Sequence, residues 1–312
     1  MSAAGEGPHV SVVVALISGK RADLERCLAA LAGQRDAPPD EVLVPYDDAV
    51  ADVATLAAGF PGVRFLRAEG LDTRAARAGA SREHHDTLRT IGLRAARGEV
   101  VVLTEDHAVA TPTWCADLQA ALEAHPEAAA VGGAVEFGGK GLLARSVYYC
   151  DFGRYQNPLP EGPAPFVSDS NVAYRRAALL AVRESWEDDY HETVVHDALV
   201  ARGFAILLTP RSEVAQARSG LSLGAALRER HVWGRSYAGT RVAGAPASRR
   251  AALAAIAFLL PALLTWRLLR GALSRRREIG RFLLCLPMVA LLQTAWAAGE
   301  LAGYVSGTPG KA

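Results

Sequence analysis

The sequence lacks the patterns that mark several common classes of protein. Its four cysteines, Cys27, Cys115, Cys150 and Cys285, form no Cys-x-x-Cys pair, and no histidine stands at zinc-finger spacing. Cysteines scattered in this way are typical of a reducing compartment and argue against a structural zinc site. The N-terminus has no positively charged segment before its short, β-branched apolar run, which we interpret as a buried strand and not as a signal peptide. We therefore expect the first domain to stay in the cytoplasm.

A glycine-rich phosphate loop is also missing. The first apolar run, residues 10–17, leads into Ile17-Ser18-Gly19-Lys20-Arg21, which matches neither Gly-x-Gly-x-x-Gly nor the P-loop pattern. A dinucleotide-dependent enzyme and a P-loop NTPase are therefore disfavoured. A nucleotidyltransferase is disfavoured for a related reason, because its glycine-rich, lysine-bearing N-terminal loop is absent.

The chain has little net charge, but the charge is unevenly distributed. The 312 residues contain 34 Lys or Arg and 33 Asp or Glu. From Arg249 onward there are nine basic and two acidic residues, a net charge of +7, so residues 1–248 carry −6. An acidic body joined to a basic, apolar tail differs from a neutral globular protein.

Apolar runs alternate with helical patterns over the first two thirds of the chain. We predict strands at 10–17, 41–45, 63–66, 99–104 and 128–135, and helices at 50–58, 82–97 and 112–125. Continuous Val and Leu runs indicate strands that are covered on both faces. The pattern predicts an α/β fold with a Rossmann-like, mostly parallel sheet flanked by helices. Such sheets bind ligands at the carboxyl ends of their strands.

Two of these strand ends are acidic. Asp47 and Asp48 follow the second strand, and Glu105-Asp106-His107 follows the fourth. Oxygen ligands suit Mg²⁺ or Mn²⁺, which can neutralise a diphosphate as its bond to a departing group breaks. The alternative is that the Glu105 to His107 acids cap the helix that begins near Pro112, or face water.

Two polar stretches lie further along the chain. Residues 168–171 (Ser-Asp-Ser-Asn) are expected to lead into a helix start, where they would be ordinary capping residues. Residues 186–192 place four acids and a histidine before the predicted helix Val194–Arg202. A charge run is usually a solvated surface, but at a helix N-terminus the dipole lowers carboxylate pKa values.

Other motifs complete a recognisable order. Residues 89–99 (RTIGLRAARGE) precede the fourth strand, Pro112 and Trp114 follow its acids, and Glu192 stands eleven residues before the Gly203-Phe204 pair. In order and spacing these motifs resemble the inverting glycosyltransferases of family 2, over about residues 9–240. The resemblance implies a GT-A fold and transfer of a sugar from a nucleotide-diphosphate sugar donor.

The resemblance also implies roles for the donor-side residues. Asp47 and Asp48 would contact the nucleotide, and Arg89 would approach the donor. Asp106, with Glu105 or His107, would hold a divalent cation on the diphosphate. Together with Arg235, these residues form the expected donor and metal site: Asp47, Asp48, Arg89, Glu105, Asp106, His107 and Arg235. Arg235 is added because residues 228–235 replace the Gln-x-x-Arg-Trp signature of processive enzymes and still offer cations to the diphosphate.

On the acceptor side, Glu192 would be the general base that takes the proton of the attacking hydroxyl. Asp188 and Asp189 are rival bases, since a one-turn shift of the loop would exchange them. Ser170, Asn171 and Arg175 correspond to the acceptor-side loop of the family. The first aspartate of the usual Asp-x-Asp motif is replaced by Thr104, which leaves strict metal dependence open.

The tail contains two uncharged segments, 251–266 and 282–299, which as helices measure about 24 and 27 Å against about 30 Å of hydrocarbon. An arginine-rich linker, residues 267–281, joins them. If both segments spanned, this linker would lie outside the cytoplasm, against the positive-inside tendency. A re-entrant or interfacial hairpin on anionic lipid, bent at Pro261 and Pro287, avoids that conflict.

We therefore predict four regions: a disordered N-terminus (1–8), a GT-A catalytic domain (9–245), a membrane-associated helical hairpin (246–305) and a flexible tail (306–312). The expected enzyme lies on the cytoplasmic face of the cell membrane and takes part in the assembly of lipid-linked or envelope glycans. Its expected partners are the nucleotide sugar, a lipid or glycan acceptor and membrane lipids, but not nucleic acid. The competing interpretation is a catalytically inactive nucleotide-sugar-binding or scaffold relative.

Overall fold

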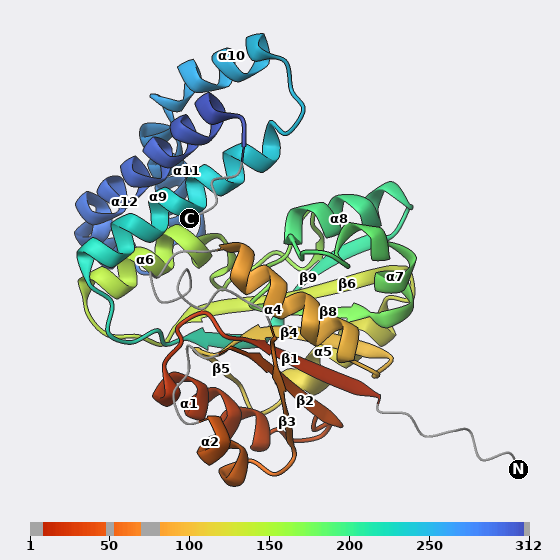
Figure 1. The fold of residues 1–312 in the computed structure, drawn as a ribbon. Coiled ribbons are helices and arrows are strands. Elements are labelled where there is room, and N and C mark those ends of the chain that lie inside the picture. The colour runs from red at the N-terminus through yellow and green to blue at the C-terminus, as the bar shows by residue number, and fades with distance from the viewer. Residues whose placement is uncertain (1–8, 48–52, 70–81, 309–312) are drawn as a thin grey trace, which may run out of the picture. The chain divides into compact units, whose positions relative to one another are not determined.

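The computed structural model describes residues 9–47, 53–69 and 82–308 (Figure 1). The chain divides by its contacts into two compact units. The first contains residues 1–71, 83–138 and 155–218, and the second contains residues 72–82, 139–154 and 219–312. We call them the sheet unit and the helical unit. The helical unit begins before the domain boundary expected after residue 245, and it includes a segment from the middle of the chain.

The sheet unit is built on one mixed sheet whose strand order is β3-β2-β1-β4-β8-β6-β9-β5, with β7 paired to β9 (Figure 1). The four strands β3, β2, β1 and β4 are mutually parallel, and β6 is parallel to β9. Strand β8 is antiparallel to both of its neighbours. The bounds are β1 Val10–Ala15, β2 Glu41–Tyr46, β3 Val63–Arg67, β4 Val100–Glu105, β5 Ala108–Ala110, β6 Ala128–Phe137, β7 Gly162–Pro163, β8 Asn171–Arg175 and β9 Ala205–Gln216.

The predicted strands and helices are present, and the predicted fold class is confirmed. Every residue of β1 and β4 is buried, as expected of valine-rich strands covered on both faces. The helices of this unit are α1 Arg21–Ala32, α2 Val53–Gly59, α4 Arg82–Ala95, α5 Trp114–Ala124, α7 Arg176–Ala181 and α8 Glu192–Ala201. Single 3₁₀ turns lie at Gly153–Tyr155 and Arg183–Ser185.

One prediction about local structure is wrong. The stretch after Ser170 does not enter a helix directly but forms strand β8, and α7 begins only at Arg176. The side chain of Asn171 explains the difference. Its amide donates to the carbonyl of Ala134 at 2.8 Å, and its oxygen accepts the indole N–H of Trp114 at 2.8 Å. Asn171 therefore links β8 to β6 and α5, and caps no helix.

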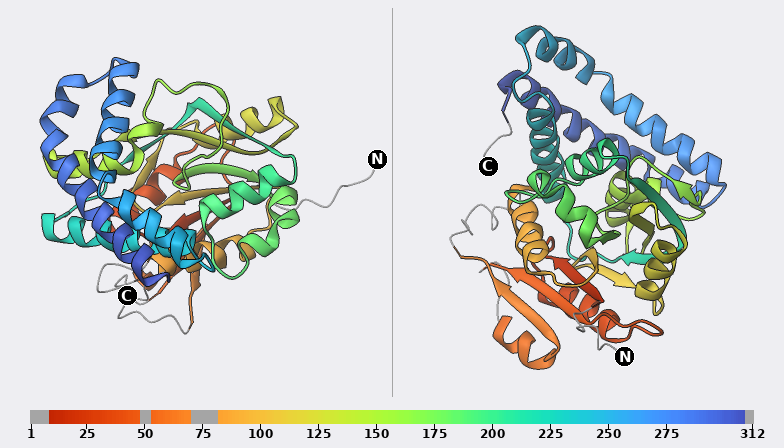
Figure 2. Two further views of the ribbon diagram at one scale, coloured as in Figure 1. Left: turned by 90° about the horizontal axis from the view of Figure 1, so that it is seen from above. Right: turned by 90° about the vertical axis from the view of Figure 1, so that its right-hand side faces the viewer.

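The helical unit consists of α6 Leu142–Phe152, α9 Leu223–Arg241, α10 Ala247–Ala257, α11 Leu260–Arg275 and α12 Ile279–Ser306. Helix α12 packs against the other four, and α11 runs beside it (Figure 2). The predicted uncharged segment 251–266 is divided between α10 and α11, which meet at an angle of 61°. Pro261 lies in the first turn of α11, where proline is favoured, while α12 continues through Pro287.

Helix α12 is long and apolar enough to cross a membrane, judged by length and composition alone. Helices α10 and α11 meet the same criterion only if the bent pair is counted as one span. Core helices of soluble proteins satisfy such a criterion too, so it does not by itself place the chain in a membrane.

Candidate active site

Glu105 and Asp106, at the end of β4, bind different groups of the protein, and His107 contacts both. Successive side chains at a strand end alternate between opposite sides. The carboxylate of Asp106 accepts hydrogen bonds from the N–H groups of Ile17 and Ser18 at 3.1 and 3.0 Å and from the Ser18 hydroxyl at 2.7 Å. His107 Nδ1 lies 3.0 Å from the same carboxylate. Burial favours a raised pKa for Asp106, but hydrogen bonds from His107 and Ser18 outweigh it and hold that pKa below its usual range.

Asp106 therefore fixes the loop that follows β1. Both carboxylate oxygens accept hydrogen bonds from groups of the chain itself, and the role of Asp106 as a metal ligand stays a prediction.

The second ring nitrogen of His107 approaches Glu105. Glu105 Oε2 lies 3.5 Å from His107 Nε2 and accepts a hydrogen bond from the side-chain amide of Gln216 at 3.0 Å. Gln216 ends β9 and is 4% exposed. Its Oε1 atom is buried and has no hydrogen-bond partner within the described part of the chain. A carboxylate, an imidazole and an orphaned amide oxygen are a plausible donor set for the divalent cation that the fold family implies.

Arg89, on α4, joins three carboxylates, of which Asp86 and Glu105 are buried and Asp169 is half-buried. Its guanidinium lies 3.0 Å from Asp86, 3.2 Å from Glu105 and 2.8 Å from Asp169, and its side chain is only 5% exposed. Burial favours a lowered pKa for Arg89, but the surrounding acids raise it, so the guanidinium stays charged. Because three carboxylates of the protein balance its charge, Arg89 organises the site, and its approach to the donor stays a prediction.

The loop before α8 is fastened at several points. The hydroxyl of Thr90 donates to the carbonyl of Trp186 at 3.1 Å, and the Trp186 indole donates to the carbonyl of Leu179 at 2.8 Å. At the other end of the loop, the Tyr190 and Tyr174 hydroxyls lie 2.8 Å apart. These contacts hold the acidic segment, residues 186–192, in one conformation.

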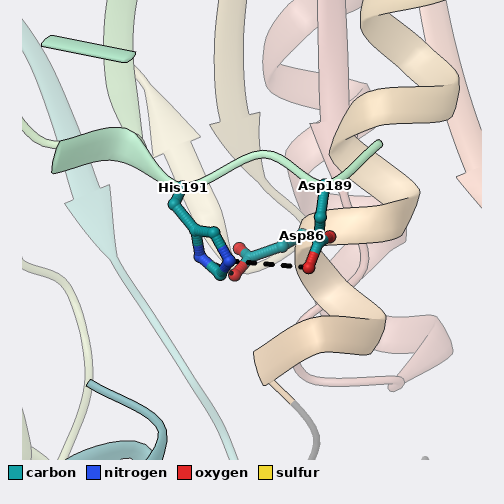
Figure 3. A group of neighbouring side chains, drawn as sticks. All are labelled: Asp86, Asp189 and His191. Carbon is teal, nitrogen blue, oxygen red and sulfur yellow. Dashed lines mark ion pairs between the residues drawn. The ribbon is translucent and has the colours of Figure 1, made fainter. Parts of the chain in front are cut away.

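Two members of that run join Asp86 in a cluster. His191 Nδ1 lies 3.0 Å from Asp86, and His191 Nε2 lies 3.6 Å from Asp189 (Figure 3). The three side chains offer ligand atoms within 4.8 Å of one another, so they could also hold a metal ion. Asp86 comes from α4, whereas Asp189 and His191 come from the loop, so the cluster links these two elements (Figure 3).

Glu192 is the first residue of α8 and is half-buried. Its Oε2 atom accepts the backbone N–H of Asp169 at 3.3 Å. Because the carboxylate of Asp169 pairs with Arg89, the candidate base is tied to the same centre as Glu105. Asp188, one of the rival bases, is exposed.

The remaining donor-side predictions have mixed outcomes. Asp47 is buried directly after β2, and β1 lies between β2 and β4, so Asp47 is at the same edge of the sheet as Glu105. Asp48 lies outside the described residues. Arg235 belongs to α9 of the helical unit, and its role at the diphosphate stays a prediction.

The acceptor-side roles stay predictions, and the structure gives each of the three residues contacts within the protein. The Ser170 hydroxyl is fully buried and lies 2.9 Å from that of Ser168, and Asn171 is bound within the core as described above. Arg175 donates to the carbonyls of Leu122 and Ala128 at 2.5 and 2.9 Å, which caps the end of α5. Its strand partner is Val100, at the opposite end of β4 from Glu105. Ser170 and Asn171 thus support the fold from inside it, whereas Arg175 is half-buried.

Sequence reasoning missed Asp86, Asp169 and Gln216. Asp86 gave a weak signal, since it stands three residues before Arg89 on one helix face. Asp169 was present in the noted polar stretch but was assigned no role. Gln216 gave no signal, because only the pairing of β9 with β5 and β6 brings it to Glu105.

This arrangement defines a class of protein: a GT-A-type sheet with a charged centre at the carboxyl edge of its parallel strands. A family model, "Glycosyl transferase family 2", matches residues 11–183. The chain belongs to that family.

Several solved structures are similar to this chain at low sequence identity. A mannosyltransferase from Pyrobaculum calidifontis, PcManGT, in complex with GDP-Man and Mn²⁺ is 20% identical, with 97% of this chain and 88% of that chain covered and a TM-score of 0.53. Residues 1–349 of S. aureus TarS, in complex with UDP-GlcNAc, are 13% identical, with 90% and 71% covered and a TM-score of 0.47. A second TarS structure is 15% identical, with a TM-score of 0.43; 72% of this chain but only 39% of that chain is covered. No curated protein matches the chain.

Proposed function

We propose that this protein is a glycosyltransferase that moves a sugar from a nucleotide-diphosphate sugar to an acceptor hydroxyl, with inversion at the anomeric carbon. The observation that carries the proposal is the connection between Glu105 and Glu192. One guanidinium, that of Arg89, binds both Glu105 and Asp169, and the backbone of Asp169 binds Glu192. A donor-side carboxylate and a candidate base thus share one rigid support, which is what transfer between two bound substrates requires.

Glu192 would act as the general base. The acceptor oxygen attacks the anomeric carbon, its proton passes to the Glu192 carboxylate, and the bond between that carbon and the diphosphate oxygen breaks, with its electron pair leaving on the diphosphate. The N–H of Asp169 and the N-terminus of α8 both favour the ionised carboxylate that this step needs.

Glu105, His107 and Gln216 would hold a divalent cation. When bound, that cation supplies positive charge to the diphosphate. An imidazole ligand is a poor match for Mg²⁺, which prefers oxygen, so this donor set favours Mn²⁺ of the two cations suggested by the sequence. The complex of PcManGT with GDP-Man and Mn²⁺ supports a nucleotide sugar as donor and Mn²⁺ as cation.

We further propose that the acceptor is lipid-linked or part of an envelope glycan, and that the enzyme works on the cytoplasmic face of the cell membrane. The support is the apolar α12 and the arginines around it. A tail of this kind would hold the sheet unit beside an acceptor that cannot leave the bilayer.

The substitution Glu192→Gln tests the base. Donor binding, followed as thermal stabilisation by a panel of nucleotide sugars, should be retained, whereas release of nucleotide in the presence of acceptor membranes should fall at least a hundredfold. Asp188→Asn is the matched control, because Asp188 lies nearby but is exposed. If the unaltered protein binds a nucleotide sugar and turns over none in any membrane extract, the competing interpretation of a catalytically inactive relative is correct.

A further inference from the structure

The outward face of α12 is uncharged over most of its length. Between residues 284 and 298 its exposed positions recur every three or four residues, which is the spacing of a single helical stripe. The stripe consists of Leu284, Pro287, Leu291, Thr294 and Ala298. The most exposed leucine of the stripe, Leu284, is 72% exposed. A surface helix of a soluble protein carries charged and polar residues on this face, so the stripe is built for an apolar environment.

The inward face of α12 carries the polar groups instead. Gln293 and Glu300 are buried, and the Glu300 carboxylate accepts hydrogen bonds from the Trp296 indole at 2.5 Å and the Tyr304 hydroxyl at 2.6 Å. An apolar outside with a satisfied ionisable group inside is the arrangement of helices that contact lipid.

Helix α9 prevents α12 from crossing a bilayer alone. The two helices run parallel at backbone contact: a Cβ added to Gly299 would lie 2.0 Å from the His231 carbonyl oxygen, and one added to Gly303 would lie 2.4 Å from that of Arg235. Helix α9 exposes Arg228 and Arg241 near its two ends. Arg241 donates to the Tyr304 hydroxyl near the C-terminal end of α12. Arg228 lies beside the middle of α12, because the nearby Ala226 packs with Leu292, and it would be carried into the hydrocarbon at a high cost if α12 spanned the membrane.

The first half of α12 is bound in the same way by α6. The guanidinium of Arg145 lies 3.0 Å from Glu278, which directly precedes α12, and the rings of Tyr149 and Phe282 lie 5.0 Å apart between centroids. One long side of α12 is therefore covered by charged helices, and only the apolar stripe is left for lipid.

The junction of α10 and α11 provides a second apolar feature. Phe258 and Leu259, at the 61° bend, are 74% and 67% exposed. Helix α10 has 11 residues and measures about 16 Å, which is too short for about 30 Å of hydrocarbon. The two exposed apolar side chains at the bend suit insertion into one leaflet.

Arginines lie around these apolar surfaces. The exposed ones are Arg267, Arg270, Arg276, Arg277 and Arg281. Glu278, the acid among them, already pairs with Arg145 and Arg281. A basic belt beside apolar side chains complements anionic lipid headgroups.

We propose that the helical unit lies in the plane of an anionic membrane surface, with the stripe of α12 and the α10–α11 bend inserted into one leaflet and no described helix crossing it. This inference rests on the membrane association proposed above and adds the orientation.

Depth measurements along the stripe test the orientation. Leu284→Cys, Leu291→Cys and Ala298→Cys, each in the full chain with Cys150→Ala, are labelled with a bimane and bound to vesicles of phosphatidylcholine and phosphatidylglycerol. Quenching of the bimane fluorescence by brominated lipids then measures how deep each label lies in the bilayer. The three sites are about 10 Å apart along the helix. We expect the labels at all three positions to lie at the same shallow depth. A label at position 291 that lies deeper than those at positions 284 and 298 would mean that α12 spans the membrane, and would overturn the proposal.

A binding assay distinguishes a wrong orientation from a lack of membrane association. Leu284→Glu should weaken partitioning onto these vesicles at least tenfold, while Leu180→Glu, an exposed leucine of the sheet unit, should not. Vesicles of phosphatidylcholine alone should bind more weakly. If the unaltered chain binds neither vesicle, membrane association fails as well. If it is dimeric and Leu284→Glu makes it monomeric, the stripe is covered by a second copy and the proposal fails.

Discussion

The guanidinium of Arg89 lies 2.8 Å from the carboxylate of Asp169, and 80 residues of sequence separate the two. Through this pair the N-terminal half of the sheet unit, which carries Glu105, is fixed to the loop that orients Glu192. The Arg89 side chain is 5% exposed, so its contribution to stability depends on compensation of its charge by the carboxylates around it.

Replacement of Arg89 should therefore destabilise the protein strongly. Arg89→Leu leaves Asp86, Glu105 and Asp169 without their shared cation, and breaking a buried ion pair costs about 3–5 kcal/mol. The free energy of unfolding in urea measures the effect. Arg183→Leu, which removes an exposed pair with Glu187, should change stability by less than about 1 kcal/mol. Equal losses in the two variants would show that the buried centre is not organised by Arg89.

Metal binding should depend on Glu105 and His107. Mn²⁺ should raise the melting temperature of the unaltered protein, since a ligand that binds only the folded state stabilises it, and EDTA should remove the gain. His107→Ala and Glu105→Gln should abolish the response, whereas Glu99→Gln, an exposed acid before β4, should keep it. A full response in His107→Ala would place the cation elsewhere, with the cluster of Asp86, Asp189 and His191 as the next site to alter.

Acid should destabilise the sheet unit through His196. This side chain is fully buried beside the Tyr174 hydroxyl, at 2.8 Å, and burial lowers its pKa to about 4. The unfolded chain, with a histidine pKa near 6.5, binds the proton more readily than the folded chain in this range. Stability should therefore fall as the pH drops from about 6.5 to about 4, by up to about 1.4 kcal/mol per pH unit from this group.

His196→Gln removes the titration and should flatten that part of the stability curve measured by urea unfolding. His125→Gln, at an exposed histidine, is the matched control and should leave the curve unchanged. An unaltered slope in His196→Gln would assign the acid sensitivity to other groups.

The sequence by itself determined the features that depend on neighbouring residues. The valine runs of β1 and β4 predicted buried strands, and the alternation of strands with helices predicted the sheet. The position of Glu105, Asp106 and His107 at a strand end predicted where the charged centre lies. Each of these follows from local periodicity and from the rule that the ends of parallel strands meet at one edge.

Only the tertiary structure decided which of those side chains are available for chemistry. Asp106 is engaged by Ser18 and Ile17, 88 and 89 residues away, and Arg89 by acids from three segments. Asn171 became a strand residue because partners on β6 and α5 bind its side chain. A buried charge or amide goes where its hydrogen bonds can be satisfied, and those partners come from distant parts of the chain that no local pattern can identify.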